Sequence, residues 1–173
     1  MRDLTDRDKM TRFMLLFGRA ARSECRVYFT GGCTAVLMGW RASTVDVDLK
    51  FEPESDELFR ALQDIKESLS INIELVSPPD FIPSVPGWED RCVYIGREGK
   101  ASFFHYDIYS QALAKIERGH EQDIEDVQSM LADRLIGREK LLSLFLEIKP
   151  SLYRYPALEE NVFETKVREI TDH

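Results

Sequence analysis

The most constraining feature of this sequence is the segment T-V-D-V-D-L-K-F at residues 44–51, in which apolar and polar side chains alternate with a period of two. Side chains alternate across a β-strand, so the segment predicts a strand with one apolar face. That face would carry Val45, Val47, Leu49 and Phe51. The opposite face would carry Asp46 and Asp48, with Cα atoms about 6.6 Å apart. Two negative charges at that distance repel by about 2.5 kcal/mol in an effective dielectric of about 20, so the pair needs a neutralising partner.

Two kinds of partner would neutralise Asp46 and Asp48. On an exposed sheet face, water and Lys50 would lower the cost to below about 1 kcal/mol, and the aspartates would need no further role. Alternatively, the carboxylates would bind Mg²⁺, which prefers oxygen ligands, and would share a pair of ions about 3.5 to 4 Å apart. The spacing by itself favours the first explanation, because short motifs often match by chance.

Two glycines precede the aspartates. Gly31 and Gly32 stand between a strand expected at residues 27–30 and a short helix expected at residues 34–40. Glycines at such a junction form a simple tight turn, or they let bare backbone approach a phosphate group. A phosphate-binding turn, a short helix and a strand with a metal-binding pair are together the components of phosphoryl transfer from a nucleoside triphosphate. The combination therefore favours a functional site.

Hydrophobic periodicity predicts the remaining elements. They are a helix over residues 5–23, a helix capped by Ser55, a strand over residues 71–76, a hairpin of strands 91–95 and 101–106, and helices from residue 108 onward. Residues 77–87, S-P-P-D-F-I-P-S-V-P-G, hold four of the seven prolines. This density of proline predicts a surface loop without regular structure, at the rim of a site or as its lid.

This order of elements predicts an α/β (α+β) fold in which helices pack on a small mixed β-sheet and the C-terminal half is helical. The 173 residues fit a single domain, with a sheet-containing core over residues 1–106 and a helical part over residues 107–173. No apolar run approaches the roughly 20 residues that span a bilayer, and the charged start M-R-D-L-T-D-R-D-K-M does not resemble a secretory signal. We therefore expect a cytoplasmic protein that does not enter membranes.

Charge and cysteine content exclude some classes of protein. The formal net charge of −8 excludes a protein that coats nucleic acid with its whole surface. Residues 1–26 hold seven basic and four acidic residues, whereas residues 52–90 hold ten acidic and two basic ones, so a polyanionic partner is expected on the N-terminal side. Cys25, Cys33 and Cys92 lack the paired spacing of zinc or redox sites, and we expect buried thiols.

Two longer patterns carry a resemblance to a known family. The first is G-G, thirteen further residues and D-V-D-L, and the second is D-I-Y-S-Q-A-L-A-K-I-E-R-G-H-E-Q-D-I-E-D-V at residues 107–127. Together they resemble the DNA polymerase β-like nucleotidyltransferase superfamily, and in particular the small bacterial nucleotidyltransferases related to the AbiEii toxins. The resemblance implies a nucleotidyltransferase-like fold and nucleotidyl transfer from a nucleoside triphosphate with Mg²⁺ or Mn²⁺.

The resemblance also implies roles for individual residues. It implies that Gly31, Gly32 and Thr34 bind the triphosphate. Asp46 and Asp48 would bind the metal and take part in catalysis. Lys115 would bind a phosphate, and Asp123 would lie near the attacking group. Without the resemblance, Lys115, Asp123 and Asp126 would be interpreted as an ordinary charged helix face.

A third metal-binding carboxylate normally comes from a neighbouring strand in this family. Glu74 in I-N-I-E-L-V is our candidate for this metal-binding and catalytic position. Its alternative interpretation is a solvent-facing residue on an edge strand. Asp107 is the rival candidate, but its place before a helix indicates an N-terminal cap. His105 is expected to be a packed or capped histidine and not a ligand.

The resulting hypothesis is an enzyme that transfers a nucleotidyl group to an acceptor hydroxyl. The sequence does not distinguish among three classes of acceptor, which are RNA such as tRNA, protein and small molecules. The alternative hypothesis is a catalytically silent nucleotide-binding or interaction module, such as one half of a toxin and antitoxin pair with an antitoxin partner. Release of pyrophosphate separates the two, because only the enzyme would produce it.

Overall fold

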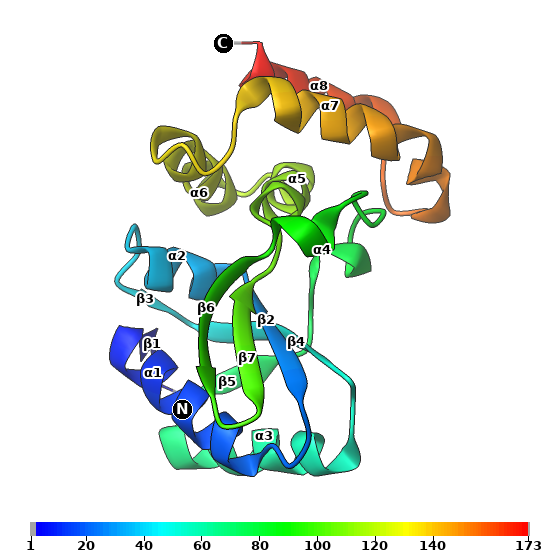
Figure 1. Cartoon of the computed structure of the whole chain (residues 1–173). Coiled ribbons are helices and arrows are strands. Elements are labelled where there is room, and N and C mark those ends of the chain that lie inside the picture. Colours follow the sequence, from blue (N-terminus) through cyan, green and yellow to red (C-terminus); the bar gives the residue numbers. More distant parts are fainter. Residues whose placement is uncertain (1–2, 173) are drawn as a thin grey trace. The chain divides into compact units, whose positions relative to one another are not determined.

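The computed structural model describes residues 3–172, which form two compact units (Figure 1). The first unit, here the sheet unit, contains residues 3–77 and Val93–His105. The second, here the helical unit, contains Pro78–Cys92 and residues 106–172. The predicted fold class is confirmed, because a mixed sheet packed with helices is followed by a helical C-terminal half.

The sheet unit is built on one five-stranded sheet. Its strands, in spatial order, are β5 (Asn72–Glu74), β4 (Asp46–Glu52), β2 (Cys25–Thr30), β7 (Ala101–His105) and β6 (Val93–Glu98). Strand β2 pairs antiparallel with β4 and parallel with β7, so the sheet is mixed. The expected hairpin is present, with β6 and β7 antiparallel, although β6 begins two residues later than predicted.

Three helices belong to the sheet unit, namely α1 (Arg7–Ala20), α2 (Gly32–Met38) and α3 (Asp56–Leu69). The predicted cap of α3 is confirmed, since the Ser55 side chain accepts a hydrogen bond from the Leu58 backbone N–H. Asp6 caps α1 in the same way by accepting from Lys9. Both caps satisfy backbone donors that the first helical turn leaves free.

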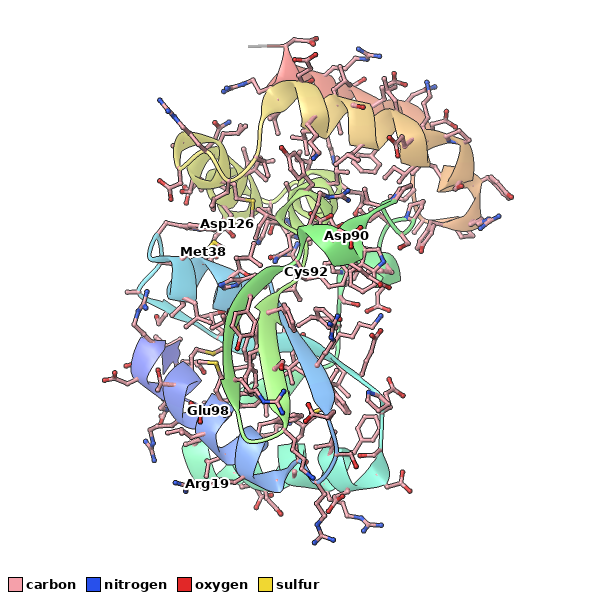
Figure 2. The ribbon with its side chains drawn as sticks, viewed as in Figure 1. Arg19, Met38, Asp90, Cys92, Glu98 and Asp126 are labelled. Carbon is pink, nitrogen blue, oxygen red and sulfur yellow. The ribbon has the colours of Figure 1, made fainter. Side chains whose placement is uncertain are left out.

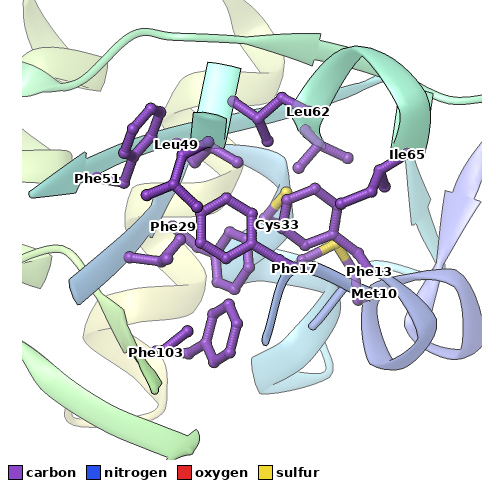
Figure 3. Packing of buried hydrophobic residues seen from close by; sticks show 14 of the residues in the cluster. Met10, Phe13, Phe17, Phe29, Cys33, Leu49, Phe51, Leu62, Ile65 and Phe103 are labelled. Atoms are coloured by element: carbon purple, nitrogen blue, oxygen red, sulfur yellow. The ribbon is translucent and has the colours of Figure 1, made fainter. Parts of the chain in front are cut away.

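One face of the sheet is covered by α1 and α3 through a cluster of buried apolar side chains (Figure 3). Phe13 and Phe17 of α1 lie against Phe29 and Phe103 of the sheet, with ring centroids 5.7 to 6.1 Å apart. Val47, Leu49 and Phe51 of β4 point into this cluster, as the alternation predicts. The opposite face of β4 therefore carries its polar side chains.

The strand expected at residues 44–51 is interrupted, which corrects one part of the prediction. Ser43–Thr44 forms a separate strand, β3, that pairs with β1 (Thr5–Asp6), and β4 begins only at Asp46. Val45 lies at the break and is 64% exposed, so it does not share the buried face. The alternation could not reveal this break, because β3 turns away to pair with a different strand.

The helical unit contains five α-helices and two short 3₁₀ helices within the described residues. They are η1 (Pro78–Asp80), α4 (Trp88–Arg91), α5 (Ile108–Arg118), α6 (Glu121–Ala132), α7 (Arg138–Ile148), η2 (Lys149–Arg154) and α8 (Glu160–Thr171). No helix of the described chain is both long and apolar enough to cross a membrane. Cys25 and Cys33 are buried as expected, whereas Cys92 is only half-buried.

The proline-rich segment differs from the irregular surface loop that we predicted. Pro78–Asp80 forms the 3₁₀ helix η1, and Ile82 and Val85 are almost fully buried. The Tyr155 hydroxyl donates a 2.6 Å hydrogen bond to the carbonyl of Pro79. Proline excludes long regular elements but suits the first turn of a helix, and the apolar residues between the prolines supply core side chains.

Candidate functional site

The polar face of β4 meets β5 at a cluster of three carboxylates. In the parallel pairing of these strands, Asp46 lies opposite Asn72 and Asp48 lies opposite Glu74. Asp46, Asp48 and Glu74 each offer one carboxylate oxygen, and these oxygens lie within 4.8 Å of one another. The sheet therefore brings together the three residues proposed from the sequence as a metal-binding set.

The chemistry of the cluster suits a hard divalent cation. All three ligand atoms are carboxylate oxygens, which Mg²⁺ and Mn²⁺ favour over soft metals. Two like charges less than 5 Å apart repel by about 3 kcal/mol in an effective dielectric of about 20. A shared cation would reverse the sign of this interaction, so the residues fit a metal ion.

The two glycines border this cluster. Gly31 has a φ of 62°, a conformation that glycine adopts without strain, and a Cβ atom there would lie 2.8 Å from Asp48 Oδ2. A Cβ atom on Gly32 would lie 2.0 Å from Thr44 Oγ1. Gly31 is thus required beside a carboxylate of the cluster, whereas Gly32 is required for packing against Thr44 of β3.

Asp46 is held at both its main chain and its side chain. Its backbone carbonyl accepts a 3.2 Å hydrogen bond from Thr44 Oγ1. Its Oδ1 atom accepts a hydrogen bond from the side-chain amide Nδ2 of Asn72. No sequence pattern indicated a role for Asn72, although its position two residues before Glu74 places it on the same strand face.

Thr34 lies inside the sheet unit and is fully buried. Its Oγ1 atom is 3.0 Å from Nδ1 of His105, the last residue of β7. Burial lowers the pKa of His105 to about 4, so the ring is neutral at physiological pH. His105 is packed and hydrogen-bonded, as expected, while direct contact of Thr34 with a nucleotide stays a prediction.

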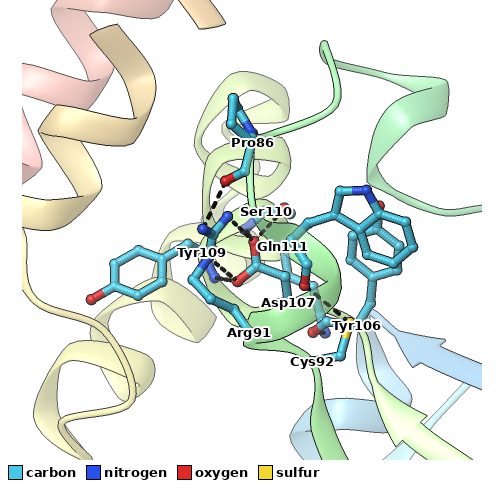
Figure 4. Close-up of polar contacts among 9 residues, drawn as sticks. Pro86, Arg91, Cys92, Tyr106, Asp107, Tyr109, Ser110 and Gln111 are labelled. Atoms are coloured by element: carbon cyan, nitrogen blue, oxygen red, sulfur yellow. Dashed lines mark hydrogen bonds and ion pairs between the residues drawn. The ribbon is translucent and has the colours of Figure 1, made fainter. Parts of the chain in front are cut away.

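Asp107 is the N-cap of α5, as its sequence position indicated (Figure 4). Its carboxylate accepts hydrogen bonds from the backbone N–H groups of Tyr109 and Ser110 and from Ser110 Oγ. Arg91 donates two further bonds, of 3.1 and 2.8 Å, to the two carboxylate oxygens. These contacts define a structural role for Asp107 and leave Glu74 as the candidate third ligand.

Lys115 and Asp123 lie in the helical unit, within a buried ionic cluster of α5 and α6. Lys115 Nζ is 2.8 Å from Asp126 Oδ2 and 3.7 Å from Asp123 Oδ1; Asp126 lies on α6 (Figure 2). Arg118 forms two bonds, of 2.7 and 2.6 Å, with Asp123. These acids are 2% exposed, so they do not form the solvated helix face that was the alternative interpretation.

Opposing effects act on the pKa of Asp123. Burial raises it, but the hydrogen bonds and charge of Arg118, together with the charge of Lys115, outweigh burial and hold the pKa below its ordinary value. Asp123 is therefore an anion that the cluster itself neutralises. To contact a substrate as well, Asp123 would have to share its carboxylate between that substrate and its partners Arg118 and Lys115.

A mixed sheet that carries clustered carboxylates on adjacent strands, beside a glycine turn, defines a protein of nucleotidyltransferase-like fold. The chain belongs to a family described as a nucleotidyltransferase of unknown function (DUF6036), whose model matches residues 7–172. No curated protein and no solved structure matches the chain significantly. The family match covers both units, and it supports a transferase that uses a nucleotide substrate.

Proposed function

We propose that this protein is a divalent-metal-dependent nucleotidyltransferase, which moves a nucleotidyl group from a nucleoside triphosphate to an acceptor hydroxyl. The observation that carries the proposal is the convergence of Asp46, Asp48 and Glu74, whose carboxylate oxygens lie within 4.8 Å of one another. The family match supports the same reaction class.

The proposed roles follow from the contacts in the sheet unit. Asp46, Asp48 and Glu74 would hold Mg²⁺ or Mn²⁺, and the bound metal would supply charge neutralisation of the triphosphate and activation of the acceptor hydroxyl. Gly31 and Gly32 would bind the triphosphate through their backbone; Gly31 leaves room for it beside Asp48, whereas the missing Cβ atom of Gly32 faces Thr44. Thr34 would support this turn from inside the unit, where its hydroxyl contacts His105.

Lys115 and Asp123 enter the proposal through the family resemblance, with Lys115 at a phosphate and Asp123 near the attacking group. Lys115 Nζ already contacts Asp126 and Asp123, so a phosphate would compete with two carboxylates for this cation. The proposal therefore assigns these two residues a weaker direct contribution than the three carboxylates of the sheet unit.

The acceptor is proposed to be RNA such as tRNA, a protein hydroxyl or a small molecule. The alternative to the enzyme is a catalytically silent nucleotide-binding or interaction module, such as a toxin and antitoxin component with an antitoxin partner. A polyanionic acceptor would be favoured by the basic excess of residues 1–26. These acceptor classes differ in size and chemistry, so one labelling experiment distinguishes them.

The test incubates the protein and Mg²⁺ with each of four α-labelled nucleoside triphosphates and a whole-cell extract. We expect label in one fraction, RNA, protein or small solutes, together with release of pyrophosphate. The variant Asp48→Asn should give no label, whereas Asp64→Asn, an exposed acid on α3, should match the parent. Nucleotide binding without pyrophosphate release or label from any of the four would contradict the enzyme and favour the silent binding module.

A further inference from the structure

The side chain of Asn72 lies at the edge of the carboxylate cluster and contacts it directly. Asn72 is the first residue of β5 and lies opposite Asp46, while Glu74 on the same strand lies opposite Asp48. Because side chains alternate along a strand, Asn72 and Glu74 share one face. The amide Nδ2 of Asn72 donates a hydrogen bond to Oδ1 of Asp46. The amide therefore reaches one of the three carboxylates that converge at this site.

We propose that Asn72 is a positioning residue for the metal site, acting through Asp46; this inference rests on the proposed function. A carboxylate rotates about its terminal bond unless a fixed donor holds it. The bond from Asn72 holds one oxygen and leaves the lone pairs of the other for a cation. Groups that orient metal ligands in this way raise metal affinity without touching the metal.

A neutral amide suits this position better than a fourth acid would. Asp46, Asp48 and Glu74 already bring three negative charges close together. The amide donates to Asp46 without adding a further negative charge to the cluster. The Thr44 hydroxyl donates to the Asp46 carbonyl and so also holds the backbone of this residue.

Asn72 also contributes to the position of Glu74. Strand β5 has only three residues and, among residues 3–172, lies at the edge of the five-stranded sheet. A side-chain bond from its first residue to β4 supplements the short backbone ladder that keeps Glu74 opposite Asp48. Loss of the amide would thus loosen two of the three proposed ligands.

The test measures Mn²⁺ binding to the protein by electron paramagnetic resonance, with Mn²⁺ alone and no nucleotide. Asn72→Ala and Asn72→Leu both remove the donor, but only leucine keeps a side chain of similar volume. We expect each to weaken Mn²⁺ binding about tenfold, with a metal-free melting temperature within a few degrees of the parent. The matched control is Asn161→Ala, which changes the other asparagine and should bind Mn²⁺ like the parent.

The outcomes separate this inference from the proposed function. Parent-like Mn²⁺ binding by both Asn72 variants would overturn the positioning role while leaving the metal site intact. A loss in Asn72→Ala that Asn72→Leu restores would also overturn it, because volume and not the donor would then matter. If the parent itself binds no Mn²⁺, the proposed metal site fails and this inference fails with it.

Discussion

The two aspartates of β4 differ in what surrounds them, although only one residue separates them. Asp46 is held by the amide of Asn72 and, at its carbonyl, by Thr44. Asp48 lies beside Gly31, in the turn between β2 and α2, and opposite Glu74 of β5. The sequence indicated the shared face of the aspartates, but the contacts with Asn72, Gly31 and Glu74 come from residues that are distant in the chain. Each neighbour can be tested by a single substitution.

Glu74→Gln should abolish turnover while leaving the protein folded. Glutamine keeps the shape of the side chain but removes one negative ligand. Changing a residue that only orients a metal ligand lowers metal affinity or activity about 10- to 100-fold. Removing a direct ligand should therefore lower the rate of turnover at least about 100-fold. Pyrophosphate release measures this effect.

Asp107→Asn is the matched comparison for Glu74→Gln, because Asp107 was the rival third ligand. Asparagine at this cap loses the charge-assisted bonds from Arg91, so unfolding free energy should fall by about 2 kcal/mol. Activity measured well below the melting temperature should persist. The reverse pattern, with Glu74→Gln active and Asp107→Asn inactive, would show that the third ligand is assigned wrongly.

Gly31→Ala should impair metal binding, and Gly39→Ala should not. Both glycines have positive φ values, 62° and 99°, so alanine strains the backbone at each by about 1 to 3 kcal/mol. Only the Gly31 position adds a clash, because its Cβ atom would lie 2.8 Å from Asp48 Oδ2, while that of Gly39 meets nothing within 4 Å. Mn²⁺ titration compares them, and equal affinities would exclude a role for the turn at the site.

The buried ring of His105 predicts a pH dependence of stability. Its pKa is lowered to about 4 from an ordinary 6.5, so the unfolded state binds more protons between these values. This contribution to stability is intact above about pH 6.5 and is lost progressively as the pH falls, by about 2 to 3 kcal/mol at pH 4.5.

His105→Gln should therefore lose less stability than the parent when the pH is lowered from 7.5 to 4.5. The measurement is the free energy of unfolding in urea at both pH values. His120→Gln, at an exposed residue, should keep the dependence of the parent. Identical pH dependence in His105→Gln and the parent would contradict a neutral buried ring.

At the scale of elements, local signals in the sequence predicted α1, α3 and the hairpin. Their apolar periodicity and the Ser55 cap act over a few residues and need no tertiary information. The break at Val45 and the packing of the proline-rich segment could not be predicted in this way. Val45 is exposed because Ser43–Thr44 pairs with β1, and Pro79 is fixed by Tyr155, which lies 76 residues away.

The α5 and α6 pair gives a prediction about the buried ionic cluster. Lys115→Met removes the cation 2.8 Å from Asp126, and loss of one partner from a buried ion pair costs about 3 to 5 kcal/mol. The double variant Lys115→Met/Asp126→Leu should be less destabilised than the single one, because the buried Asp126 charge is removed together with Lys115 and Asp123 keeps its two bonds to Arg118.

Urea unfolding of the Lys115 variants supplies the measurement, with Arg22→Met as the control. Arg22 pairs with Glu57 at 2.7 Å, but its side chain is 83% exposed, so the control should change stability by less than about 1 kcal/mol. A Lys115→Met protein as stable as the control would contradict the structural role of the cluster.

At the scale of the whole molecule, the sequence predicted the class of protein better than the contacts within its site. The glycine pair, the D-V-D pattern and the third carboxylate follow from strand periodicity and the family resemblance, and the family match supports that class. The strand order β5-β4-β2-β7-β6 joins segments that are not consecutive in the chain. Contacts that depend on this order, such as Asn72 with Asp46 and Thr34 with His105, therefore required the structure.

The central claim is that Asp46 and Asp48 are kept together in order to bind a catalytic metal. If so, the pair repels itself whenever metal is absent, and Asp46→Asn/Asp48→Asn removes that repulsion while keeping the shape of both side chains. The double variant should be at least as heat-stable as the parent in metal-free buffer. Its melting temperature should not rise with Mg²⁺ and nucleotide, whereas that of the parent should rise through ligand binding.

The most direct measurement is pyrophosphate release from a nucleoside triphosphate by the parent and by Asp46→Asn/Asp48→Asn, in the presence of Mg²⁺ and the acceptor fraction. We predict release by the parent and none by the double variant, which the thermal measurements would show to be folded. A folded double variant that releases pyrophosphate at the rate of the parent would contradict the mechanism, because the two aspartates would then be solvated charges without a catalytic role.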